Sequence, residues 1–394
     1  MTDDVFYQYN PWWESESYLR DLRPRDYYVE RIVGRLSPRR AVLLTGLRRV
    51  GKSTIMRLVA HRLIRAGLDP GCILYMSLDD YLLRDTSILD IISQFRRLHA
   101  HSVDLEITVL LDEVTAKADF HQQAKTLIDR ERVRLVASSS SASLLTDQRA
   151  YLTGRNTSLE IQPLTFREYL QFRQISIARR DAHLIDTHFR QFVREGGLPE
   201  HVLHPSRDYL MGLVDDIIQK DITAFHGLKD HQVVRDYFTL LMERCGKQVS
   251  INKLGRILGL SPDTSRRYLG YFEQTFLVHL VARHGKTNER MLSPKKAYAG
   301  DLGIKHLFTG DRDWGSYFEN YVYLRLRAHQ SVEYVRVEQN ELDFLTADDT
   351  LVEAKYNAVL EGRQKNAFQA YPAARKRVMT SVKELQALEE LWER

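Results

Sequence analysis

The residues with the clearest chemical pattern lie between positions 46 and 54. The spacing G-x-x-x-x-G-K-[ST] is matched by the run Gly46-Leu47-Arg48-Arg49-Val50-Gly51-Lys52-Ser53-Thr54. In this pattern, backbone N–H groups of a glycine-rich turn and of a helix N-terminus point at the phosphates of a nucleotide. Lys52 would reach the β- and γ-phosphates of ATP, and Ser53 would bind Mg²⁺. The spacing therefore predicts a site for ATP and Mg²⁺.

A pair of acidic residues further along the chain matches the second requirement of such a site. Asp112 and Glu113 directly follow the apolar run 107–111, which has the composition of a buried strand. Asp112 is expected to hold Mg²⁺ through its water shell, and Glu113 is expected to polarise the attacking water as the general base. The alternative is a strand that ends in acidic residues without a function.

Hydroxyl groups and one arginine complete the predicted ATP site. Four serines at 138–141 follow a strand-like run, and the carboxyl ends of parallel strands are where nucleotides bind. Ser138 or Ser139 would sense the γ-phosphate, and Ser139 is assigned to the site; otherwise the serines form a solvated loop. Arg155 follows a glycine turn. It is either an arginine finger, acting in cis or on the ATP of a neighbouring subunit, or a surface charge.

A second group of charged residues lies near the C-terminus. Two strand-like runs, 341–346 and 351–355, flank a polar turn, and side chains alternate between the faces of a strand. A hairpin would place Asp343 opposite Lys355 and diagonal to Glu353. Asp343 and Glu353 would then bind Mg²⁺, and Lys355 would position the nucleophile of a phosphodiester cleavage or offset negative charge. The alternative is that these charges form the solvent-exposed face of a hairpin.

The elements around these residues indicate an α/β protein. An apolar strand-like run at 41–44 precedes the loop, and a helical pattern at 55–60 follows it. The composition is 43% hydrophobic and 28% charged, which is typical of a globular protein, and the net charge of +5 weakly favours a nucleic-acid partner. Two cysteines, no signal peptide and no membrane-spanning run favour the cytoplasm and no membrane partner.

A helix–turn–helix pattern lies between positions 249 and 280. A short helix at 251–258 meets a turn at Gly259, and Ser261 has the character of an N-cap before Pro262 and a second helix. In the DNA-reading version the second helix enters the major groove. Its exposed residues would be Asp263, Thr264, Arg266 and Arg267. The alternative is a rigid spacer or a protein contact. The basic cluster at 373–377 is interpreted as a solvated helix face, and the alternative is a contact with backbone phosphate.

The order of the motifs resembles that of a known family. The chain carries GLRRVGKST, LLDEVTAKADF, LVASSSSASLL, TGR, PLTFREYL, EGGLPE and DIIQKDI. This order is similar to that of bacterial and archaeal AAA-type ATPases with a C-terminal domain of unknown function related to PD-(D/E)XK nucleases. The resemblance implies a P-loop ATPase core with a helical lid, a winged-helix module and a nuclease-like α/β domain. It also implies that Glu319, in the helix before the acidic strands, is a further metal ligand.

The resemblance and the residues together predict an ATP-dependent DNA-processing protein. ATP hydrolysis would control a Mg²⁺-dependent nuclease site, in repair or in defence against foreign DNA. The alternatives are an ATP-driven switch or scaffold, or a DNA motor, with an inactive nuclease-like domain. The partners would be DNA and, if Arg155 acts in trans, further copies of the chain. The predicted parts are an N-terminal helical segment (1–38), the ATPase core (39–164), the lid (165–245), the winged helix (246–290) and the nuclease-like domain (291–394).

Overall fold

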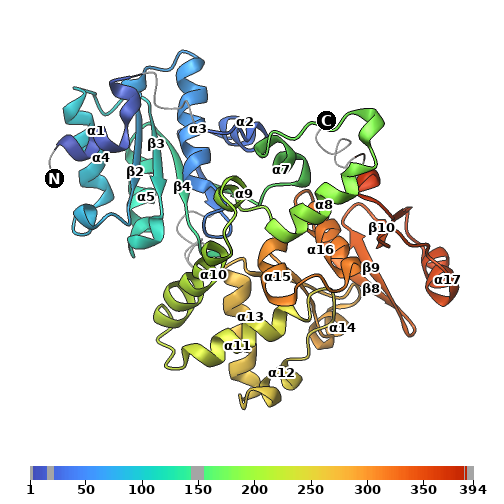
Figure 1. Cartoon of the computed structure of the whole chain (residues 1–394). Helices are drawn as coiled ribbons and strands as arrows, with labels where there is room; N and C mark the ends of the chain where they lie inside the picture. Colours follow the sequence, from blue (N-terminus) through green and yellow to red (C-terminus); the bar gives the residue numbers. More distant parts are fainter. Residues whose placement is uncertain (1–2, 16–21, 143–154, 386, 388–394) are drawn as a thin grey trace. The chain divides into compact units, whose positions relative to one another are not determined.

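The protein is described by a computed structural model that covers residues 3–15, 22–142, 155–385 and 387 (Figure 1). The chain divides into two compact units, Met1–Gln162 and Pro163–Arg394. None of the helices within these described ranges is long and apolar enough to cross a membrane.

The first unit is built on a parallel sheet with the strand order β2-β3-β4-β1-β5. The strands are β1 (Ala41–Thr45), β2 (Ile73–Ser77), β3 (Ile107–Asp112), β4 (Val133–Ser138) and β5 (Asn156–Glu160). The helices are α1 (Asp3–Tyr9), α2 (Asp26–Val33), α3 (Lys52–Arg65), α4 (Ile88–Leu98) and α5 (Phe120–Arg130), and 3₁₀ turns span Pro11–Trp13, Pro70–Cys72, Tyr81–Leu83 and Val114–Ala116. These elements confirm the predicted strand–loop–helix order around the glycine-rich run.

Helices cover both faces of this sheet, which explains why its central strands are apolar along their whole length. Alternate residues of β1, β2, β3 and β4 pack with α1, α4 and α5 in one core, while α3 lies against β2, β3 and β4. The register sets Leu44 of β1 beside Ser138 of β4, and Leu111 of β3 beside Ala137 of β4. The carboxyl ends of β1, β3 and β4 therefore meet at one edge of the sheet, where the predicted ATP residues follow the strands.

The second unit begins with helices and ends with a mixed sheet. Its helices are α7 (Phe166–Phe172), α8 (Leu184–Glu195), α9 (Pro199–Leu203), α10 (Arg207–Asp216), α11 (His231–Met242), α12 (Ile251–Ile257), α13 (Pro262–Gln274), α14 (Thr287–Leu292), α15 (Leu302–Thr309), α16 (Trp314–Arg327) and α17 (Gly362–Ala370), with a 3₁₀ turn at Arg179–Asp181 and a π-helix at Ile217–Ala224. Its strands are β6 (Val278–Val281), β7 (Lys296–Ala299), β8 (Val332–Val337), β9 (Asn340–Thr346), β10 (Thr350–Ala354) and β11 (Arg375–Met379).

Strands β8 to β11 form a sheet in the order β11-β10-β9-β8, and β6 pairs with β7 separately. Helix α16 packs on one face of the four-stranded sheet, against Phe344 and Val352, and α17 contributes to the core on the other face with Leu345 and Leu351. The basic residues 375–377 lie in strand β11, so the interpretation of this cluster as a helix face is wrong. The reason is that β11 pairs in parallel with β10 along its whole length.

Segments of the second unit that are distant in sequence share one core. Residues of α7 and α8, in the segment predicted as the ATPase lid, share a core with α16 and with the four-stranded sheet. Tyr321 of α16 accepts a hydrogen bond from the N–H of Phe166 at 2.9 Å, and its ring lies 5.4 Å from that of Phe189. The pair β6–β7 also joins residues on both sides of the predicted boundary at 290. Aromatic contacts between segments distant in sequence decide this packing.

Candidate functional site

The glycine-rich loop connects β1 to α3 in a conformation that requires glycine. Gly46 has φ +139°, and a Cβ atom at this position would lie 2.2 Å from the carbonyl oxygen of Ile161. Gly51 has φ +98° and precedes the first turn of α3, which has no side-chain cap. The N–H groups of that first turn have no partners within the helix, so they are available to phosphate oxygens.

Lys52 is the first residue of α3 and is almost completely buried. Its Nζ donates hydrogen bonds to the carbonyl oxygens of Gly46 at 2.9 Å and of Leu47 at 3.1 Å. The ammonium group is therefore held over the loop by backbone oxygens. This is the position from which a lysine can bind the phosphates of ATP.

Asp112 ends β3 and is held by hydroxyl groups from the two neighbouring strands. Tyr75 of β2 donates a hydrogen bond to Oδ2 of Asp112 at 2.8 Å, and Ser138 of β4 donates to Oδ1. Ser53, the second residue of α3, lies near the same phenol. Burial and Asp112 both raise the pKa of Tyr75, so this phenol stays a donor. Tyr75 thus lies between Ser53 and Asp112, the two predicted Mg²⁺ ligands.

Glu113 follows Asp112 in the left-handed region, with φ +48°. Its N–H donates to Ser138 Oγ at 3.2 Å, and Ser140 Oγ donates to its Oε2 at 3.3 Å. Burial raises the pKa of Glu113, while Lys52 lowers it. A carboxylate with a raised pKa is a stronger base than an exposed one, as a general base requires.

The serines at the end of β4 and directly after it differ in their contacts. Ser138 and Ser140 contact the acidic pair, whereas the Ser139 hydroxyl donates to the carbonyl oxygen of Ser141 and accepts from its N–H, both at 3.0 Å. The Ser138 hydroxyl proton is thus already donated to Asp112, and a contact of Ser138 or Ser139 with the γ-phosphate stays a prediction. Ser140 and Tyr75 were not predicted as site residues, since four consecutive serines and an isolated strand tyrosine carry no signal of which hydroxyl faces the acids.

Arg155 lies at the end of the sheet opposite the loop. Its carbonyl oxygen accepts a hydrogen bond from the N–H of Ala41, the first residue of β1, whereas the glycine-rich loop follows the last residue of the same strand. A five-residue strand is roughly 13 Å long from first to last residue. The side chain forms an ion pair with Asp129 of α5. Arg155 is therefore not placed to act in cis on the ATP of its own chain, and the turn before it lies outside the described residues.

Arg25 is a buried residue that the sequence did not identify. Its guanidinium donates to the carbonyl oxygens of Val50 at 3.3 Å and of Gln162 at 3.0 Å, and it lies 4.7 Å from the centre of the Tyr28 ring. It thereby ties the glycine-rich loop to the segments before β1 and after β5. Taken together, the loop donors, Lys52 and the oxygen ligands around Asp112 fit a nucleotide with Mg²⁺, which prefers oxygen ligands.

The C-terminal residues converge, but with a register that corrects the prediction. Strand β10 pairs with β9 so that Val352 lies beside Phe344. Continuing this antiparallel register places Glu353, and not Lys355, opposite Asp343. The hairpin turns one residue earlier than expected, because Asp349 adopts φ +58° and its N–H donates to the carbonyl oxygen of Thr346 at 3.0 Å. The two carboxylates are therefore direct cross-strand neighbours.

Both carboxylates are buried and hydrogen-bonded. Asp343 Oδ2 accepts from the N–H of Ala354 at 3.0 Å, and Glu353 Oε2 accepts from the N–H of Asp343 at 3.2 Å. Glu353 Oε1 accepts from Gln364 of α17 at 2.8 Å and forms an ion pair with Lys355 Nζ at 2.8 Å. Burial and the neighbouring Asp343 raise the pKa of Glu353, whereas Lys355 lowers it.

Glu319 of α16 joins the same cluster through a lysine that was not predicted. Its Oε1 accepts from Tyr298 Oη at 2.7 Å and forms an ion pair with Lys296 Nζ at 2.8 Å. Lys296 Nζ also lies 3.0 Å from Glu341 Oε1 and 3.5 Å from Asp343 Oδ1. Burial and the charge of Asp343 raise the pKa of Glu319 to about 7, although Lys296 lowers it.

The structure thus brings together all four predicted residues of the second site, Glu319, Asp343, Glu353 and Lys355. Within the described part of the chain, however, no three His, Cys, Asp or Glu side chains are arranged to hold a metal ion. The Lys296 ammonium lies among the carboxylates instead. A lysine in the short apolar strand β7 was the only signal in the sequence, and nothing in its neighbourhood indicated which acids it would meet.

The helix–turn–helix elements form as predicted. Gly259 has φ +66° in the turn between α12 and α13, and Ser261 caps α13 by accepting a hydrogen bond from the N–H of Thr264 at 3.1 Å. Arg266 is exposed and lies 3.2 Å from Asp263 on the same helix face. A DNA contact by this helix stays a prediction.

Comparison with known proteins agrees with the predicted ATPase fold of the first unit. Residues 38–170 match an AAA domain family, and residues 186–314 match a domain of unknown function (DUF8612). An uncharacterized protein of Haemophilus influenzae is 24% identical over 83% of this chain and 85% of its own, and one of Methanocaldococcus jannaschii is 24% identical over 86% and 80%. AMPPCP-bound DnaA from Aquifex aeolicus is 15% identical over 62% of this chain and 86% of its own, but with a TM-score of only 0.27. The chain therefore contains an AAA domain, followed by a region that matches a domain of unknown function.

Proposed function

We propose that this protein binds and hydrolyses ATP at its AAA domain, and that the nucleotide state controls a DNA-holding C-terminal part. The observation that carries the first half is the meeting of Lys52, Ser53, Asp112 and Glu113 at one edge of the parallel sheet, linked through Tyr75 and Ser138. Such a group of residues supports phosphoryl transfer to water, because it supplies phosphate donors, metal ligands and a base in one place.

Each residue of the ATP site has a defined role in this proposal. Lys52 and the N–H groups at the start of α3 bind the phosphates. Ser53 and Asp112 would hold Mg²⁺, which when bound offsets the negative charge of the phosphoryl group. Glu113 orients the attacking water and accepts its proton, helped by the raised pKa that burial gives it. Arg25 holds the loop in place through Val50.

The test of the first half is ATP binding and hydrolysis by three variants. Lys52→Ala is expected to lose both, whereas Glu113→Gln is expected to bind ATP and lose hydrolysis. Lys125→Ala, which removes an exposed lysine of α5, serves as the matched control and should behave as wild type. Hydrolysis at the wild-type rate in Glu113→Gln would contradict the assigned role of this residue.

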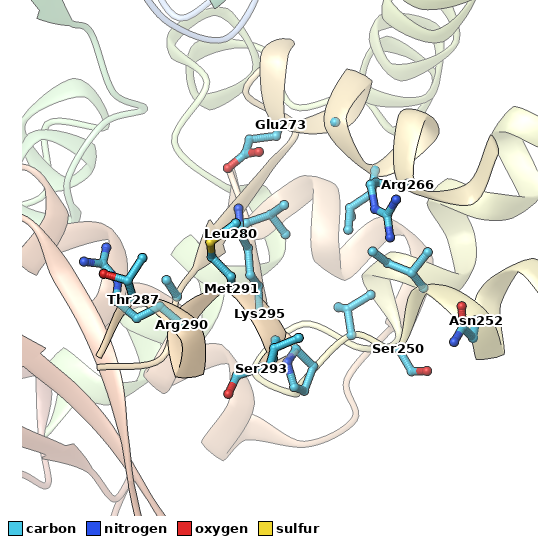
Figure 2. A pocket seen from close by; sticks show the side chains of 17 residues that line it. Ser250, Asn252, Arg266, Glu273, Leu280, Thr287, Arg290, Met291, Ser293 and Lys295 are labelled. Atoms are coloured by element: carbon cyan, nitrogen blue, oxygen red, sulfur yellow. The ribbon is translucent and has the colours of Figure 1, made fainter. Parts of the chain in front are cut away.

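The proposal of DNA as the partner is supported by charge. Residues 246–290 contain eight Lys or Arg and three Asp or Glu, a net charge of +5 that equals the formal net charge of the whole chain. A groove of about 940 Å³ beside α13 is lined by the basic residues Arg266, Arg290 and Lys295 and by one acidic residue, Glu273, among others. Figure 2 shows Arg266 and Arg290 on opposite sides of this groove, with Lys295 between them. Clustered positive charge of this kind is the usual electrostatic feature of nucleic-acid binding.

The test of the second half is the affinity for a fluorescently labelled DNA duplex at several salt concentrations. Arg266→Glu and Arg290→Glu are expected to weaken binding and to reduce its salt dependence, because each removes a phosphate contact. Arg180→Glu, at an exposed position outside the basic segment, is the control. Equal affinity in all three variants would contradict DNA binding by this groove. ATP hydrolysis stimulated by DNA would indicate a motor.

A Mg²⁺-dependent nuclease is the second candidate function of the C-terminal part. It is favoured by one observation, the convergence of Asp343, Glu353, Lys355 and Glu319 in a single cluster. Cleavage of end-labelled DNA that needs Mg²⁺ and disappears in Asp343→Asn would support it. A C-terminal part that only holds DNA predicts no cleavage in this assay, whereas the nuclease predicts cleavage that depends on Mg²⁺ and Asp343.

A further inference from the structure

The position of Lys296 decides what the C-terminal cluster can bind. Lys296 is the first residue of β7, and its side chain is 1% exposed. The side chain contacts Glu319 of α16 and Asp343 of β9. Its Nζ lies within 3.5 Å of one carboxylate oxygen from each of three residues, Glu319, Glu341 and Asp343. Burial alone would lower the pKa of Lys296, but these carboxylates raise it, so the ammonium stays charged.

A divalent metal at this place would need the same oxygen atoms. Mg²⁺ requires oxygen ligands at about 2.0–2.1 Å in nearly octahedral geometry. Every carboxylate oxygen of Asp343 and Glu353 already accepts a hydrogen bond or forms an ion pair, with Lys296, Lys355, Gln364 or a backbone N–H. A metal ion bound by Asp343 would also lie close to the Lys296 charge, which repels it.

We propose that the Lys296 ammonium is the resident cation of this cluster and that it closes the cluster to divalent metals. The C-terminal domain then keeps the predicted residues of a nuclease site without the metal that the Mg²⁺-dependent cleavage would require. Lys296 instead links β7, β9 and α16 by ion pairs, which makes the cluster a structural connection inside the second unit. This inference concerns the second candidate function and does not depend on ATP hydrolysis by the AAA domain.

The experiment is to count bound Mn²⁺ in the full-length protein without nucleotide, by electron paramagnetic resonance of the free ion. The proteins are wild type, Asp343→Asn, Lys296→Met, Lys296→Arg and the double variant Lys296→Met/Asp343→Asn. Wild type and Asp343→Asn are expected to bind equal numbers of ions. Lys296→Met is expected to gain one ion per chain, the double variant to lose it again, and Lys296→Arg, which keeps the charge, to gain none.

Two results would overturn the proposal. The first is a Mn²⁺ ion bound by wild type and lost in Asp343→Asn, a comparison that stands even if Lys296→Met fails to fold. The second is a folded Lys296→Met variant, judged by circular dichroism, that binds no additional ion. ATP hydrolysis measured in the same preparations keeps a failure here distinct from a failure of the proposed ATPase.

Discussion

The two acidic sites of this molecule contain similar residues but neutralise them in different ways. At the ATP site, Asp112 accepts hydrogen bonds from the neutral hydroxyls of Tyr75 and Ser138, while Lys52 is bonded to backbone carbonyls of the loop. In the C-terminal cluster, a buried ammonium lies directly among the carboxylates. Hydroxyl donors leave the charge of a carboxylate available to a metal, whereas an ion pair already offsets it. The contacts of the lysine, more than the spacing of the acids, therefore distinguish the two sites.

The largest effect is expected at the ATP site, where Glu113→Gln removes the proposed general base. Loss of a general base lowers the rate of a proton-transfer step by about 10² to 10⁴-fold. We expect hydrolysis of ATP to fall in that range, with binding of ATP retained. Glu353→Gln, the matching change in the C-terminal cluster, should leave ATP hydrolysis within about twofold of wild type, because Glu353 is not part of the ATP site. Steady-state release of phosphate measures both.

The next largest effect is expected on stability when Lys296 is replaced. Removing one partner of a buried ion pair leaves uncompensated charge and typically costs about 3–5 kcal/mol. Lys296→Met should therefore lower the free energy of unfolding by several kcal/mol. The control is Lys125→Met, which removes an exposed lysine of α5 and should change the free energy of unfolding by about 0.5 kcal/mol or less. Urea unfolding followed by circular dichroism gives both values. Equal losses would show that burial of Lys296 has no special weight.

A smaller effect is expected from the glycine-rich loop. Gly46→Ala would place a Cβ atom 2.2 Å from the carbonyl oxygen of Ile161, at a φ of +139° that other residues rarely adopt. We expect a loss of about 1–3 kcal/mol and weaker binding of ATP, because the backbone must shift. Gly212→Ala, inside α10 with open space around it, should instead be neutral or stabilise by about 1 kcal/mol. A neutral Gly46→Ala would contradict the strained conformation of the loop.

The smallest effect is expected from Arg155→Ala. In one chain Arg155 forms an ion pair between half-exposed side chains, and such pairs contribute about 0–1 kcal/mol. At low protein concentration, ATP hydrolysis per chain should change by less than about twofold, since Arg155 lies away from the loop. A large loss that appears only as the protein concentration rises would show an arginine finger acting between subunits.

The sequence predicted best what depends on local spacing. The strand–loop–helix around Lys52 was predictable because each element follows directly from the last, and Asp112 and Glu113 end an unambiguous strand. The C-terminal hairpin was predicted with the wrong pairing, because the positive φ of Asp349 moved the turn by one residue. Lys296 was missed because it meets Asp343 across 47 positions of sequence, through packing that no local pattern records.

The measurement that tests the contrast between the two sites most directly is a single incubation of wild type with ATP, end-labelled DNA and Mg²⁺. Asp343→Asn and Glu113→Gln are treated in parallel, and released phosphate and cut DNA are both measured. The account predicts phosphate release that depends on Glu113, and no DNA cleavage that depends on Asp343. Cleavage that disappears in Asp343→Asn would contradict it, because the cluster around Lys296 would then bind a metal and act as a nuclease.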